Sequence, residues 1–133
     1  MLGPLALLAC ALASPAQDPP THLGSWVHTI HNLATPSSVA VGPQQKIHVV
    51  ETSAHRVRVF DKGGKQLEIL SPVADPMVLP LGVAVAPDGK RFVSDSGNHR
   101  VLVFDTQGNR VATFGSLGTG PGQFHTPAGI DAN

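Results

Sequence analysis

Short apolar runs alternate with turn-forming residues along most of the chain, and each run has about the length of a β-strand. In the first half, these runs are Val39–Val41, Ile47–Val50, Val57–Phe60 and Gln66–Leu70. Helix-forming stretches are scarce after the first 20 residues, whereas Val, Phe, Thr and Ile recur in the runs. The pattern therefore predicts an all-β fold made of short antiparallel strands.

The pattern repeats along the chain. Residues 36–60, PSSVAVGPQQKIHVVETSAHRVRVF, align without a gap with residues 80–104, PLGVAVAPDGKRFVSDSGNHRVLVF, at a spacing of 44 residues. A third copy begins at Pro127, 47 residues after Pro80, with the three additional residues in a connection where insertions are tolerated. The second copy predicts strands at Val83–Val85, Arg91–Ser94, Val101–Phe104 and Arg110–Phe114. Four strands in about 44 residues are typical of one blade of a β-propeller.

This repeat sets the expected domain boundaries. Residues 35–79 form one blade, residues 80–126 form a second, and residues 127–133 start the next. Residues 25–34 contain Trp26 and Ile30 between polar neighbours and are interpreted as a closing strand for the last blade. Two blades and a start cannot close a ring, since closed propellers usually have four to eight blades. We therefore expect an N-terminal piece of a longer protein, with ring closure by other copies of the chain as the alternative.

The amino-terminal residues differ in kind from the repeats. Residues 1–16 carry an apolar run from Leu5 to Ala13 followed by small residues, which is typical of a secretory signal peptide, although no Lys or Arg follows Met1. Residues 17–24, which include two prolines, are interpreted as a linker. The sequence predicts a secreted or periplasmic protein. A lipoprotein anchored through Cys10, a mis-assigned start and a buried apolar segment are the alternatives.

Composition narrows the classes of partner and chemistry. The formal net charge is zero, which gives no basic field for nucleic acid. The leading apolar run is too short to span a membrane as a helix. Cys10 is the only cysteine, so a cleaved chain would have no disulfide, no thiolate nucleophile and no cysteine-based zinc site. No nucleophile elbow and no His-Glu-x-x-His pair occurs in the sequence.

The stretch SDSGNHR, before the third predicted strand of the second copy, contains most of the side chains that could bind a ligand or take part in catalysis. Because it recurs in each repeat, and a catalytic site is normally built once, we interpret it as the hairpin between the second and third strands of a blade. We expect Gly97 to supply a positive φ, and Asp95 and Asn98 to satisfy turn N–H groups. We expect Arg100 to reach Asp95 or Asp105. The predicted structural residues are Asp95, Gly97, Asn98, His99 and Arg100, with His55 and Arg56 at matching positions in the first copy.

The histidines offer no obvious metal site. His55 and His99 are equivalent residues of adjacent copies and would lie one blade apart, whereas zinc needs three or four converging ligands. His28 and His31 would point to opposite faces of a strand. His48 stands where the second copy has an aromatic residue, so we expect a packed, neutral imidazole.

The segments GVAVAPDGKRFVSDS, SGNHRVLVFD and GTGPGQFHTPAGI together resemble the NHL repeat, which is named after an Asn-His-Leu triplet. The resemblance covers about residues 35 to 133 and implies a propeller of NHL-type four-stranded blades, most often six, around a central channel. The first copy departs from it: Glu51 replaces Asp95, Ser53 replaces Gly97 and Ala54 replaces Asn98.

Two functions remain open from the sequence. The first is a secreted binding scaffold for a protein, peptide or glycan, which the absence of a catalytic group in the sequence favours over an enzyme. The alternative is a metal-dependent propeller enzyme of the amidating-lyase or lactonase type, with its catalytic residues in further blades. The resemblance to the amidating lyase implies histidine ligands at Ser37, Leu81 and Ala128, and none of these binds zinc as an imidazole does. No cofactor is expected, except a metal in a completed ring.

Overall fold

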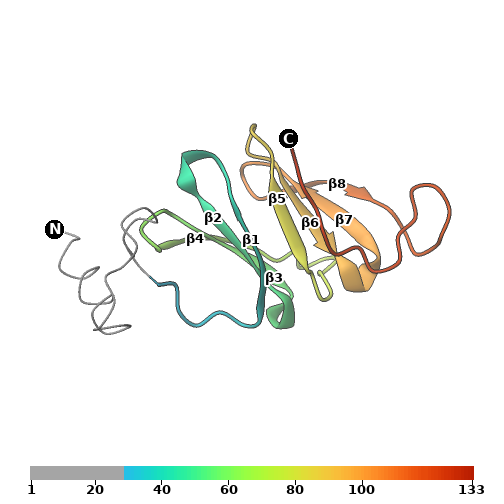
Figure 1. Ribbon diagram of the computed structural model, residues 1–133, viewed down its shortest axis with the longest axis horizontal. Helices are drawn as coiled ribbons and strands as arrows, with labels where there is room; N and C mark the ends of the chain where they lie inside the picture. Colours follow the sequence, from blue (N-terminus) through green and yellow to red (C-terminus); the bar gives the residue numbers. More distant parts are fainter. Residues whose placement is uncertain (1–28) are drawn as a thin grey trace, which may run out of the picture. The chain divides into compact units, whose positions relative to one another are not determined.

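A computed structural model describes residues 29–133, and Asn32–Asn133 form one compact unit. This unit contains two four-stranded antiparallel sheets, with strand orders β1-β2-β3-β4 and β5-β6-β7-β8 (Figure 1). The strands are β1 (Pro36–Val41), β2 (Ile47–Glu51), β3 (Arg56–Phe60), β4 (Gln66–Leu70), β5 (Gly82–Val85), β6 (Arg91–Asp95), β7 (Arg100–Phe104) and β8 (Arg110–Phe114). The predicted all-β fold with four strands per repeat is confirmed, and every predicted strand lies within an observed one.

The amino-terminal predictions lie mostly outside the described residues. The signal peptide over residues 1–16 and the linker over residues 17–24 lie there entirely, as does the first part of the predicted closing strand over residues 25–34. The described part of that last segment, residues 29–34, forms no strand. In the part of the chain that the structure describes, no helix is long and apolar enough to cross a membrane.

Each blade turns from its second to its third strand through a short 3-10 turn. In the first blade this turn is η3 (Thr52–Ala54), and in the second it is η4 (Ser96–Asn98). The next residue, His55 or His99, adopts the left-handed conformation, with φ of 53° and 55° respectively. The left-handed histidine ends the 3-10 turn and directs the chain back into the following strand, so the hairpin reverses at this position.

The turns between the third and fourth strands use Asp and Gly. Asp105 Oδ1 accepts hydrogen bonds from the backbone N–H groups of Gln107 and Asn109, and Gly108 has φ of 91°. In the first blade, Asp61 and Gly64 occupy the equivalent places, and Gly64 has φ of 83°. These turns rely on a carboxylate that accepts local N–H groups and a residue without a Cβ at positive φ.

The hydrophobic core lies between the two blades. Strands β1 and β5 lie side by side, as the inner strands of neighbouring propeller blades do (Figure 1). The buried cluster comprises Val50, Val57, Leu70, Met77, Val83, Val93, Leu102 and Phe104, with Ala40 packed against it. Full burial of a side chain of this size contributes about 1.5–3 kcal/mol. The blades are therefore held together chiefly by apolar faces, and polar contacts at their ends fix the register.

The segment over residues 127–133, where the sequence predicts the start of a third repeat, lies against the second blade. Ser94 Oγ donates a hydrogen bond to the carbonyl of Ala128 (2.9 Å), and Ser96 Oγ donates to the carbonyl of Pro127. Residues 127–133 have no strand assignment.

Candidate functional site

Asp95 lies at the end of β6 with its side chain fully buried, and its carboxylate accepts three hydrogen bonds. Oδ1 accepts from the backbone N–H of Val78 (2.7 Å). Oδ2 accepts from Nδ2 of Asn98 (2.9 Å) and Nε of Arg100 (2.7 Å). The carboxylate therefore joins the hairpin to the segment that leads into the first strand of its own blade.

The guanidinium of Arg100 bridges two carboxylates. Besides Asp95, it contacts Asp75, where NH1 lies 2.7 Å from Oδ2 and NH2 lies 3.0 Å from Oδ1. Arg110 approaches the same Asp75 at 2.7 Å. The hydrogen bonds from Arg100 and then from Arg110 lower the pKa of Asp75 to about 2. Arg100 makes no contact with Asp105, so of the two expected carboxylates only Asp95 is its partner.

His55 and His99 each hold the chain where it enters the next blade. His55 Nδ1 accepts a hydrogen bond from the backbone N–H of Leu79 (3.0 Å), and His99 Nδ1 accepts one from that of Thr126 (3.2 Å). Leu79 and Thr126 are themselves left-handed, with φ of 47° and 59°. Both histidines thus use one ring nitrogen to hold the connection that follows their own blade.

A second contact between blades recurs beside the first. Thr52 Oγ1 donates to the carbonyl of Pro80 (2.8 Å), and Ser96 Oγ donates to the carbonyl of Pro127. Pro80 and Pro127 are equivalent residues of successive repeats. The hairpin motif therefore places two hydrogen bonds on the chain as it enters the next blade, at both junctions that the structure describes.

The first blade keeps the buried acid in spite of its different sequence. Glu51 is fully buried and accepts from the backbone N–H of Ala34 (2.8 Å), the residue equivalent to Val78. It also pairs with Arg56 (2.5 Å) and Arg58 (3.4 Å). Burial raises the pKa of Glu51, but the hydrogen bonds from Arg56 and Ala34 outweigh burial and leave the pKa below its ordinary value.

Two expectations for the hairpin are wrong. Gly97 is not among the residues with positive φ, and the left-handed position falls on His99. The structure needs a glycine for space: a Cβ on residue 97 would lie 2.6 Å from the carbonyl oxygen of Val78. Neither Asp95 nor Asn98 accepts a backbone N–H of the turn, and the backbone donor to Asp95 is Val78, from the preceding loop. The Asn98 side chain is a donor instead. Its amide donates to the carbonyl of Pro76 (3.1 Å) and to Asp95.

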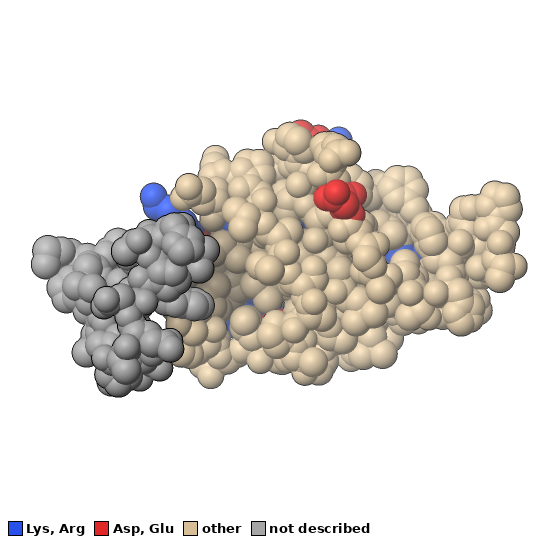
Figure 2. All heavy atoms as spheres, viewed as in Figure 1, with Lys and Arg blue, Asp and Glu red and all other residues tan. Residues whose placement is uncertain are grey.

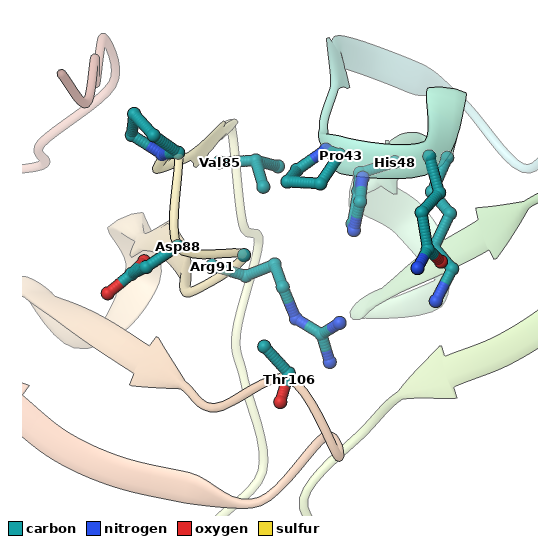
Figure 3. Close-up of a pocket in the computed structure, with 10 residues that line it drawn as sticks. Pro43, His48, Val85, Asp88, Arg91 and Thr106 are labelled. Carbon is teal, nitrogen blue, oxygen red and sulfur yellow. The ribbon is translucent and has the colours of Figure 1, made fainter.

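A cavity of about 210 Å³ lies between the two blades, at the end of the sheets opposite the hairpin motif. Figure 3 shows the side chains of His48 and Arg91 pointing from their two blades toward this space, with Asp88 and Thr106 at its border. His48 is 2% exposed and Arg91 is 3% exposed. Both ring nitrogens of His48 and the Nε of Arg91 are buried without a hydrogen-bond partner.

Burial, reinforced by the nearby positive charges, lowers the pKa of His48 and keeps its imidazole neutral. Burial, and then the positive charge of Arg91, lower the pKa of His48 to about 4. Polar backbone groups of Lys46 and Ala40 partly oppose this shift, although neither meets the ring nitrogens in hydrogen-bond geometry. Arg91 is itself paired through NH2 with Glu68 (2.8 Å). The cavity therefore offers a neutral imidazole and a guanidinium whose Nε–H is buried and unpaired.

Sequence reasoning missed Asp75 and the cavity for different reasons. Asp75 lies in the loop between the blades, and its partners are 25 and 35 residues away, a separation that no local pattern predicts. For the cavity a signal existed. Arg91 stands where the first copy has Ile47, and His48 stands where the second has Phe92. Two polar residues thus replace apolar ones at positions that face each other across the junction.

Metal-binding geometry is not found in residues 29–133, where no group of three or more His, Cys, Asp or Glu side chains converges. On the face of the molecule that Figure 2 shows, Lys, Arg, Asp and Glu atoms are few and scattered, so no charged patch covers the blades there.

Comparisons with known proteins agree with this architecture. The model of the NHL repeat family matches residues 78–104, from the segment before β5 to the end of β7. Among solved structures, hydrazine synthase from Kuenenia stuttgartiensis matches with a TM-score of 0.60 at 22% identity, covering 78% of this chain and 28% of that one. A streptogramin B lyase matches with a TM-score of 0.58 at 15% identity, covering 73% and 30%. Comparison with curated protein sequences finds no match.

A gluconolactonase from Xanthomonas campestris also matches, with a TM-score of 0.54 at 24% identity, covering 86% of this chain and 35% of that one. The chain thus spans about a third of the length of these structures, and the likeness shows the fold alone. The two sheets are blades of a β-propeller. Within the second blade, residues 78–104 match the NHL repeat, and the first blade has the same order of four antiparallel strands.

Proposed function

We propose that these blades are part of a secreted binding propeller, which holds a protein, peptide or glycan ligand on a rigid frame. One observation carries the proposal: at both junctions the hairpin motif uses its histidine and its hydroxyl to hold the backbone of the next blade. Side chains that resemble catalytic groups thus have a repeated structural task. A rigid frame with variable turns is the arrangement on which many binding surfaces are built.

The binding surface is proposed at the end of the blades opposite the hairpin motif. There the turns after β1, β5 and β7 surround the cavity, whereas the motif end is occupied by contacts between blades. Export is part of the same proposal and is supported by the apolar run Leu5–Ala13 and the small residues after it.

A propeller enzyme is the second candidate, because a streptogramin B lyase and a gluconolactonase are among the structures that this fold resembles. In that case a metal would lie in the channel of a completed ring, held by residues of other blades. Ser37, Leu81 and Ala128 cannot supply imidazole ligands to it.

One experiment separates the two functions. The purified full chain is applied to peptide and glycan arrays, and hydrolysis of gluconolactone is followed in parallel with and without a chelator. Saturable binding that the free ligand competes away and that the chelator leaves unchanged supports the scaffold. Lactone turnover that the chelator abolishes overturns it in favour of the enzyme.

Matched variants locate the surface. Gln107→Arg changes the turn between β7 and β8 at the cavity end, and Thr113→Arg places the same side chain on the exposed outer strand β8. We expect only Gln107→Arg to weaken ligand binding. An equal loss in both variants would contradict the proposed position of the surface.

A further inference from the structure

We propose that the cavity between the blades binds a small carboxylate, with the Nε–H of Arg91 and a ring N–H of His48 as its hydrogen-bond donors. This inference deepens the binding role proposed above by naming one ligand chemistry, and it rests on that role. The two residues come from different sheets, His48 from β2 and Arg91 from β6, so the site exists only where the blades meet.

The first argument is the state of the polar atoms. His48 and Arg91 are both more than nine-tenths buried, and three of their nitrogens have no hydrogen-bond partner. Buried polar groups in folded proteins are nearly always paired, so each exception needs an explanation. A bound carboxylate would supply the acceptors that Arg91 Nε–H and a ring N–H of His48 lack.

The second argument is that this pair departs from the repeat. At the equivalent positions the first blade has Ile47 and the second has Phe92. An apolar residue therefore suffices for the fold at each position. The frame does not require the two polar side chains, whereas the hairpin motif recurs because the frame requires it.

Charge and size select the ligand. Among the residues that line the cavity, the cations Lys46 and Arg91 exceed the anion Asp88 by one while His48 is neutral. The partners of the two ion pairs, Glu68 with Arg91 and Lys90 with Asp88, leave this excess unchanged. A single negative charge is thus balanced there. The volume of about 210 Å³ lies below the roughly 300–1,000 Å³ that is usual for drug-sized ligands. The site fits a small acid, or the carboxylate end of a larger ligand whose remainder stays outside.

Binding of an anion should be coupled to protonation of His48. The charges that act on the imidazole are Arg91 from β6 and Lys46 before β2. Asp88, from the turn after β5, lines the same cavity, and Glu68 from β4 is paired with Arg91. Burial and Arg91 disfavour the imidazolium, and a bound carboxylate would favour it. If the ligand restores the pKa of His48 to near its ordinary value of 6.5, affinity rises about tenfold from about pH 7.5 to about pH 5.5.

The test follows the ring signals of His48 by NMR while acetate is titrated into the full chain, with acetamide as the neutral control of the same shape. We expect acetate to shift the His48 signals saturably, more tightly at the lower pH, and acetamide to leave them unchanged. An absent response to acetate at both pH values overturns the proposal. An equal response to acetamide also overturns it, because the site then does not select charge.

Variants assign the response to the site. His48→Phe gives the first blade the residue that the second blade has at this position, Phe92. Because this variant has no imidazole signal, its acetate binding is followed through the backbone amides that line the cavity. Arg91→Lys keeps a positive charge beside Glu68 but removes the Nε–H. We expect both to lose acetate binding, whereas His125→Phe, the same change at an exposed histidine outside the cavity, keeps it. Binding that survives in both cavity variants contradicts the assignment.

A second titration distinguishes two sources of the ligand carboxylate, the carboxyl terminus of a peptide and a free small acid. A short peptide with a free carboxyl terminus is compared with the same peptide amidated. Binding of the free peptide alone identifies peptide ends as the ligand, and binding of acetate without the peptide identifies free small acids; both outcomes support the site. If the arrays detect a ligand while acetate and peptide leave His48 unchanged, the proposed binding role stands and this inference fails.

Discussion

His55 accepts a hydrogen bond through Nδ1 from the backbone N–H of Leu79 (3.0 Å), so the hairpin of the first blade holds the chain at its entrance to the second. Leu79 has φ of 47°, a left-handed conformation that costs a residue with a Cβ roughly 1–2 kcal/mol. His99 and Thr126 repeat this relationship after the second blade, where the left-handed Thr126 again donates its backbone N–H to the imidazole. The imidazole therefore stabilises a backbone conformation that the junction needs and that its own sequence disfavours.

Replacing either histidine should loosen one junction. We expect His55→Ala to lower the free energy of unfolding by about 1 kcal/mol, because the bond to Leu79 is lost at an exposed position where water can replace it in part. His55→Asn should cost less, because Asn tolerates the left-handed conformation. Hydrogen exchange of the Leu79 amide measures the effect directly. Unchanged exchange at Leu79 in His55→Ala would show that the bond does not hold the junction.

The buried carboxylate of Asp95 should matter more than any exposed acid. Asp95→Asn removes the buried negative charge that faces Arg100 and leaves the guanidinium with Asp75 as its only carboxylate partner. We therefore expect the free energy of unfolding to fall by about 2–4 kcal/mol. Urea unfolding at neutral pH measures it. Asp88→Asn is the control, because that side chain is 55% exposed and its replacement should leave the urea unfolding midpoint nearly unchanged. Equal losses in the two variants would refute the role assigned to Asp95.

The blades could be predicted from the sequence because each strand and turn is specified by residues that are close together in the chain. Alternating apolar residues and Asp-Gly turns lie next to each other in the chain, and a second copy confirmed each strand at the same offset. Two strands, Gln66–Leu70 and Arg110–Phe114, have the predicted bounds, and others extend the prediction by one to three residues. These extensions follow from pairing partners: Arg100 joins β7 because Asp95 lies opposite it.

The contacts between blades were not predictable in the same way. The repeat shows that His55 and His99 are equivalent, but it does not show that their partners are Leu79 and Thr126, 24 and 27 residues further along. The error at Gly97 has the same origin. Glycine commonly marks a positive φ, and only the position of Val78, brought in from the preceding loop, shows that the space is the reason.

Gly97 gives a steric prediction that distinguishes the two blades. Gly97→Ala places a Cβ 2.6 Å from both Cγ1 and the carbonyl oxygen of Val78, and the backbone atom cannot yield easily. We expect a loss of about 1–3 kcal/mol in thermal or urea unfolding. The first blade has Ser53 at this position, so Ser53→Ala is the matched control and should change stability by under about 0.5 kcal/mol. If Gly97→Ala is as stable as the parent chain, the close approach of Val78 is not a constraint.

His48 should make the stability of the blades depend on pH. Its folded-state pKa of about 4 lies below the ordinary 6.5, so between these values the unfolded chain binds more protons than the folded one. The contribution of His48 is therefore complete above about pH 6.5 and decreases as the pH falls toward about 4. We expect a loss of about 2 kcal/mol between about pH 7 and about pH 4.5 from this group.

The measurement is urea unfolding of the parent chain and of His48→Phe at both pH values. Phe does not titrate and fits the position, as Phe92 does in the second blade. The variant should therefore lose less stability on acidification than the parent, by about the same 2 kcal/mol. Other carboxylates with lowered pKa values, such as Asp75, titrate alike in both chains and cancel in the difference. Parallel pH profiles in the two proteins would show that His48 is not held neutral by its burial between the blades.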